Sequence, residues 1–195
     1  MATCDIVAFI MKRLSALALL CIAPYMGHAG ALNLATLSCS KYQNEVLPAA
    51  TDSLNTVMWL FGYSVAKSGA HVMYSDALAP FGFALDTECK SNPIETILDA
   101  LTIVKPETKK PMDLTEVDCE AFASRHTEFI RTDADSAHTI MMWLFGFSVA
   151  KSGSHIFDAD YLPTFETTLL AECAKHPKDD LFHALTSIKP AAVIK

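Results

Sequence analysis

The stretch WLFGYSVAKSGAH at residues 59–71 returns as WLFGFSVAKSGSH at residues 143–155, with 11 of 13 positions identical. Two shorter matches follow each copy in the same order: CKSNP and LDALTIVKP after the first, CAKHP and FHALTSIKP after the second. A pattern repeated at a fixed spacing indicates two related structural units. We therefore assign residues 32–106 to a first unit, 107–116 to a polar linker and 117–195 to a second unit.

The beginning of the chain has the pattern of an export signal. A basic segment, MKR at residues 11–13, precedes the apolar run LSALALLCIA at 14–23, and the small residues AGA follow at 29–31. We predict a signal peptide over residues 1–31, with Met11 as an alternative start, and a periplasmic location. The apolar run is shorter than the roughly 20 residues that cross a bilayer, so we expect no stable membrane anchor.

The net charge argues against nucleic-acid binding and predicts a strong response to acid. Without residues 1–31 the chain keeps 21 acidic and 13 basic side chains, a net charge of −8 at neutral pH. A chain this acidic is not expected to bind nucleic acid. In strong acid, protonation of every carboxylate and of six histidines would bring the net charge to +19. Such a change loads a compact protein with repulsion between like charges.

The four cysteines that follow the predicted signal peptide divide equally between the units. Aligning the units pairs Cys39 with Cys119 and Cys89 with Cys173 as equivalent positions, so each unit holds one early and one late cysteine. We predict the disulfides Cys39–Cys89 and Cys119–Cys173, since an exported chain meets an oxidising compartment. Neither a CxxC pair nor a tight Cys/His cluster is present in the sequence, so no redox or metal site and no cofactor is predicted.

Helical spacing runs through both units. Each first cysteine has an aromatic residue three positions later, and each second cysteine lies eight residues after a phenylalanine with a leucine between them. Second helices are expected over about 53–69 and 135–153, ending at glycines. The last helix of the first unit is expected to start at NPIE, with Asn92 as its cap and an apolar stripe of Ile94, Ile97, Leu98 and Leu101. The predicted fold is all-α: two small four-helix domains in tandem, each with one disulfide.

The second helix of each unit is apolar on every side, so its outer face needs a cover. Gly62, Ala66 and Ala70 lie four residues apart, as do their equivalents in the second unit, and small residues at this spacing let another helix approach closely. We predict that the two copies pack on each other, as a pseudo-dimer within one chain; the alternative is that each is buried in its own unit. The candidate interface residues are Val57, Trp59, Leu60, Phe61, Gly62, Met141, Trp143, Leu144, Phe145 and Gly146.

These features together resemble the HdeA/HdeB family of periplasmic acid-stress chaperones. The resemblance rests on the cysteine and following aromatic residue, the tryptophan-bearing helix with its glycine, and CKSNP or CAKHP before the last helix. It implies a small helical domain that is folded and paired at neutral pH. In acid such a domain would expose apolar surface and hold unfolded periplasmic clients without ATP. The ten interface residues would then also be the client-binding residues. Family members are mainly single domains that form homodimers, so the tandem arrangement is a departure.

The sequence also bears on functions other than that of a chaperone. No motif of a hydrolase, metalloprotease, nucleotide-binding or dinucleotide-binding site is found in the sequence, and an enzyme is not predicted. The main alternative is a periplasmic module whose apolar helices bind a ligand or a fixed partner without activation by acid. His71 and His155 recur after the second helices. They are interpreted as helix-end residues, with a metal site or a pH sensor as the alternative.

Overall fold

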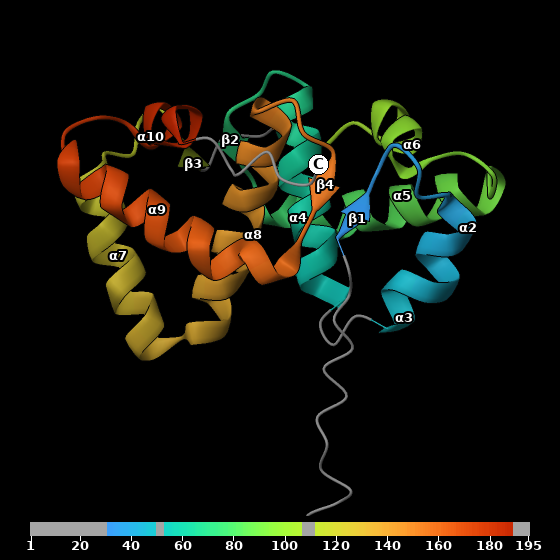
Figure 1. The fold of residues 1–195 in the computed structure, drawn as a ribbon, viewed down its shortest axis with the longest axis horizontal. Helices are drawn as coiled ribbons and strands as arrows, with labels where there is room; N and C mark the ends of the chain where they lie inside the picture. Colours follow the sequence, from blue (N-terminus) through green and yellow to red (C-terminus); the bar gives the residue numbers. More distant parts are fainter. Residues whose placement is uncertain (1–30, 50–52, 107–111, 189–195) are drawn as a thin grey trace, which may run out of the picture.

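The computed structural model describes residues 31–49, 53–106 and 112–188. The predicted signal peptide lies outside these residues except for Ala31. Two long helices, α4 and α8, cross at the centre of the molecule, and the remaining helices of each half lie on either side of this pair (Figure 1). The prediction of an all-α fold is confirmed, since the strands are only two residues long.

The first half contains a short, irregular first helical segment and three further helices. Its elements are β1 (Leu32–Asn33), α2 (Cys39–Lys41), a π-helix (Tyr42–Val46), α3 (Leu47–Ala49), α4 (Ser53–Lys67), β2 (Val72–Met73), a 3-10 turn (Ser75–Ala77), α5 (Leu78–Ser91) and α6 (Ile97–Ile103).

The second half repeats this order with a regular first helix. Its elements are β3 (Met112–Asp113), α7 (Cys119–Thr132), α8 (Ala134–Lys151), β4 (Ile156–Phe157), a 3-10 turn (Ala159–Tyr161), α9 (Leu162–Lys175) and α10 (Leu181–Ser187). Both central helices end two residues before a glycine with positive φ, Gly69 at 82° and Gly153 at 79°. Glycine adopts this conformation without steric cost, so the chain can leave each helix at this point.

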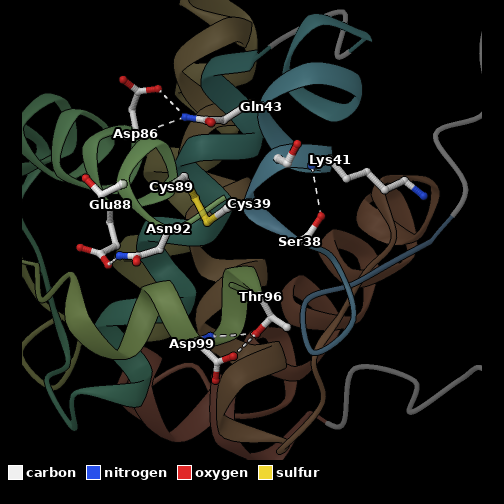
Figure 2. Close-up of a disulfide and its surroundings, with 12 residues drawn as sticks. Ser38, Cys39, Lys41, Gln43, Asp86, Glu88, Cys89, Asn92, Thr96 and Asp99 are labelled. Atoms are coloured by element: carbon white, nitrogen blue, oxygen red, sulfur yellow. Dashed lines mark hydrogen bonds between the residues drawn. A yellow bond between two sulfur atoms is a disulfide. The ribbon is translucent and has the colours of Figure 1, made fainter. Parts of the chain in front are cut away.

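Both predicted disulfides are present. Cys39 bonds to Cys89 and Cys119 bonds to Cys173, so each bond joins the first helical segment of a half to its third. All four cysteines are buried. Figure 2 shows the first disulfide between α2 and α5, with Gln43 donating hydrogen bonds to the backbone and carboxylate of Asp86 beside it. The bond therefore ties the irregular segment of the first half to a regular helix.

The expected start of the fourth helix is wrong. Asn92 terminates α5, and its side chain donates to Glu88 Oε1 instead of capping the next helix. The last helix begins at Ile97, where the Thr96 hydroxyl accepts from the backbone N–H of Asp99 (Figure 2). Ile94 consequently lies outside the helix and is 93% exposed. In the second half Asp180 caps α10 in the same way.

The short strands connect one half to the other. β1 pairs antiparallel with β4, and β2 pairs antiparallel with β3. Residues 112–116, which the sequence assigns to the linker, thus begin with strand β3 and include the fully buried Leu114. The two ladders have equivalent hydrogen bonds, because Leu34 N donates to His155 O and Leu114 N donates to His71 O, both at 2.9 Å.

Candidate functional site between the central helices

The central helices touch through their backbones at two glycines. A Cβ atom on Gly62 would lie 2.0 Å from the carbonyl oxygen of Trp143, and one on Gly146 would lie 2.0 Å from the carbonyl oxygen of Trp59. Real Cβ atoms do not approach a backbone oxygen this closely, so neither position has room for a larger residue. The predicted packing of the two copies is present, and the glycines set how near they come.

Aromatic rings extend the contact on both sides of the crossing. Trp59 meets Phe145 edge to face with ring centroids 6.3 Å apart, and Phe61 meets Trp143 in the same way at 6.5 Å. Each phenylalanine also contacts a ring of its own half, Phe81 or Phe165, at 5.2 and 5.1 Å. Edge-to-face pairs of this kind contribute about 0.5–1.5 kcal/mol beyond the burial of their surface. One aromatic cluster therefore runs from one half into the other.

Six of the ten predicted interface residues contact the opposite central helix, namely Trp59, Phe61, Gly62, Trp143, Phe145 and Gly146. All ten are buried except Val57, which is half-buried and faces the α5 residue Gly82. The indole N–H groups of Trp59 and Trp143 are buried and have no hydrogen-bond partner in the described part of the chain. With the halves closed, this surface is not accessible to another protein. Any binding function of these residues therefore requires the halves to separate.

Two histidines that the sequence interprets as helix-end residues also contact the opposite half. His155 Nδ1 lies 2.5 Å from the hydroxyl of Tyr63, and burial raises the pKa of Tyr63 to about 12. His71 Nε2 lies 3.5 Å from Asp113 Oδ1. No cluster of three or more His, Cys, Asp or Glu side chains suited to a metal occurs among the described residues.

Sequence reasoning missed the contacts that the short strands make with the opposite half. The only signal for the strands is a second alignment of the two units. Shifted by 80 positions, Leu32 and Asn33 match Met112 and Asp113, which places equivalent segments just before each first cysteine. That match marks the two segments that become β1 and β3. It does not show that each pairs with the opposite half, since strands of two residues carry no periodicity to read.

Two carboxylates, one in each half, have pKa values shifted in opposite directions. The Asp133 carboxylate caps α8, and hydrogen bonds from the Ser136 hydroxyl and then the Ser136 backbone N–H lower the pKa of Asp133. In the first half, burial and then the charges of Glu88 and Asp99 raise the pKa of Glu95. Protonation in acid therefore removes a stabilising interaction at Asp133 but relieves a destabilising one at Glu95.

The contribution of the Asp133 cap to stability should decrease as the pH falls. Because its folded pKa is depressed, the stabilisation is present above the unfolded pKa of about 3.9 and is lost as pH falls through the folded value. We expect Asp133→Asn to be less stable than the wild type at pH 7, and the difference to shrink below about pH 4. Urea unfolding at pH 7, 4 and 2.5 measures this, with Asp135→Asn as a control of equal charge in the same turn. A difference that is the same at all three pH values would contradict the assignment.

Comparison with known proteins gives one match. The HdeA/HdeB family model matches residues 101–183, from the last turn of α6 to the start of α10. The match covers most of the second half and supports the resemblance to this family. No curated protein and no solved structure matches the chain. Among the described residues, no helix is both long and apolar enough to cross a membrane.

Proposed function

We propose that this protein is an ATP-independent periplasmic chaperone that binds unfolded proteins in acid through the surfaces now joined between α4 and α8. The family match supports an acid-stress role in the periplasm at the level of the family. The observation that carries the proposal for this chain is the buried, largely apolar contact between α4 and α8 at the centre of the two halves. Its central residues are fully or almost fully buried, and they would form an apolar binding surface if the halves separated.

In this proposal the first half is another copy of the domain that the family model matches in the second half. It has the same order of helices, an equivalent disulfide and a reciprocal glycine contact. The chain would then contain in one molecule the pair that single-domain members form from two. Separation of the halves becomes an intramolecular step with an effective concentration on the order of mM, so opening should not depend on protein concentration.

Acid would drive the opening through charge. Lowering the pH takes the chain without its predicted signal peptide from a net charge of −8 toward +19, and both halves then repel each other. The disulfides persist in acid because exchange requires a thiolate, so each half stays crosslinked and can close again at neutral pH.

Aggregation of a client that unfolds in acid tests the proposal. The oxidised protein should suppress light scattering at pH 2–3 and not at pH 7, and the Trp59→Ala, Trp143→Ala double variant should protect less. Tryptophan is chosen because both rings lie at the centre of the contact. Absence of protection at every pH, from a protein that is folded and disulfide-bonded at pH 7, would contradict the proposal.

A ligand- or partner-binding module without acid activation is the second candidate. The cavity beside α7, described below, favours it in one respect, since it is present while the halves are closed. Constant affinity for a bound molecule from pH 7 to pH 3, without protection of any client, would favour this function over a chaperone.

A further inference from the structure

A largely apolar cavity of about 260 Å³ lies where the two halves meet beside α7. Its walls come from β2 of the first half and from β3, α7 and α8 of the second; they include Met73, Met112, Phe122, Arg125, His126 and Ile140. A cavity of 150 Å³ with apolar walls is enough to bind benzene. We propose that this cavity binds a small carboxylic acid with an apolar body, and that the bound molecule bridges the two halves.

The apolar lining accommodates the body of the ligand, and two side chains of α7, His126 and Arg125, are the candidates to bind its carboxylate. His126 is 7% exposed, and its Nε2 atom is buried without a hydrogen-bond partner in the described part of the chain. That atom lies 3.3 Å from Glu166 Oε1, which is within ion-pair distance but lacks hydrogen-bond geometry. Glu166 would repel an anion placed at His126, so the carboxylate of the ligand is assigned to Arg125, which lines the cavity from an exposed position.

The equivalent place beside the first helical segment of the first half has different residues at two positions. Phe157 takes the position of Met73; it is buried and packs on Trp59 with ring centroids 4.8 Å apart. By sequence, Glu45 takes the position of Arg125. The equivalent place beside the first helical segment of the first half thus has a larger side chain, contributed by the second half, in place of the methionine and the opposite charge in place of the arginine. Both differences would exclude an anionic ligand there, which makes a single site per chain the expectation.

Position gives the ligand a predictable effect on the closed form. Met73 belongs to the first half, and the α7 residues belong to the second, so a molecule in the cavity contacts both. A ligand that binds only the closed, folded protein stabilises it, by an amount that grows with the logarithm of the ligand concentration above its Kd. Binding at neutral pH should therefore raise the melting temperature. The inference does not depend on the proposed function, because it concerns the closed protein at pH 7.

Calorimetric titration with octanoate at pH 7 tests the site on the disulfide-bonded protein lacking residues 1–31. We expect one octanoate per chain and a rise in melting temperature. Met73→Phe, which copies the residue of the other half, and Arg125→Glu, which copies its charge, should each weaken binding at least tenfold. Arg131→Glu makes the same charge change on an exposed face of α7 away from the cavity lining and should leave binding unchanged.

Four results would overturn the inference. Octanoate that produces no binding heat and no change in melting temperature excludes the site. Equal affinity for the wild type and Met73→Phe places the ligand elsewhere. Binding of 1-octanol as tightly as octanoate, or equal losses in Arg125→Glu and Arg131→Glu, removes the role of Arg125. Because Met73→Phe and Arg125→Glu change different properties of the cavity, each tests the site without the other.

Discussion

Gly62→Ala should separate the two halves at neutral pH. The added Cβ would lie 2.0 Å from the Trp143 carbonyl oxygen and 3.2 Å from the Phe147 backbone nitrogen. Both are backbone atoms of α8, so the clash is relieved only if one helix moves away from the other. Overpacking of a well-packed contact costs typically 1–3 kcal/mol, and we expect about 3 kcal/mol or more here because no flexible side chain can yield. Gly146→Ala should have the same effect on α4.

Urea unfolding and tryptophan fluorescence at pH 7 measure this result. Separation should lower the unfolding midpoint, shift the emission of Trp59 and Trp143 to longer wavelength, and increase binding of an apolar dye. Gly82→Ala is the matched control, because its Cβ would meet only the end of the Val57 side chain at 3.3 Å. If Gly62→Ala were as stable as Gly82→Ala, the close contact between the helices would not hold the halves together.

Loss of either disulfide should have the second large effect. Cys39–Cys89 and Cys119–Cys173 span 50 and 54 residues. A loop of this length corresponds to about 4 kcal/mol of stabilisation in the chain-entropy treatment. Each half has fewer than about 80 residues and a correspondingly small core, so we expect the Cys39→Ser, Cys89→Ser variant to lose most of its stability at pH 7.

The two disulfides serve as controls for each other. The first fixes a segment broken into α2, a π-helix and α3, whereas the second fixes the 14-residue helix α7. Circular dichroism during thermal unfolding should show a lower melting temperature for the Cys39→Ser, Cys89→Ser variant than for Cys119→Ser, Cys173→Ser. A change of less than about 1 kcal/mol in both variants would show that packing alone holds the halves folded.

The repeat accounts for how much of the fold is predictable from sequence. Two equivalent cysteines per unit select the disulfide pairing, and helical spacing around them predicts the helices that they join. Small residues on a helix that is apolar all round predict its close contact with the other copy. These features depend on side-chain type at fixed spacing, which the sequence displays directly.

One prediction from the sequence was wrong for a local reason, and the features that it missed depend on contacts between distant segments. At CKSNP, Asn92 and Pro93 match a helix start, but Asn92 instead ends α5, and Thr96 is an equally good cap four residues later. Choosing between two caps requires knowing which one the packing allows. The ladders β1–β4 and β2–β3, and the cavity beside Met73, depend on which segments of opposite halves meet. No spacing within one segment contains that information.

The central claim is that client binding requires α4 and α8 to separate, and a crosslink between the halves tests it most directly. Asn33 and Ile156 are partners in one ladder, and Met73 and Met112 are partners in the other. Partners in antiparallel ladders have Cα atoms about 4.5–5.5 Å apart, which suits a disulfide. Replacing all four by cysteine would join the halves at two places, and replacing all four by serine gives the matched control.

The measurement is suppression of client aggregation at pH 2–3 by the crosslinked protein and by its serine control, after peptide mapping has verified all four disulfides of the former. The account predicts that the serine control protects the client and that the crosslinked protein does not. Equal protection by the two proteins would contradict it, because the surface between α4 and α8 could not then be the one that binds.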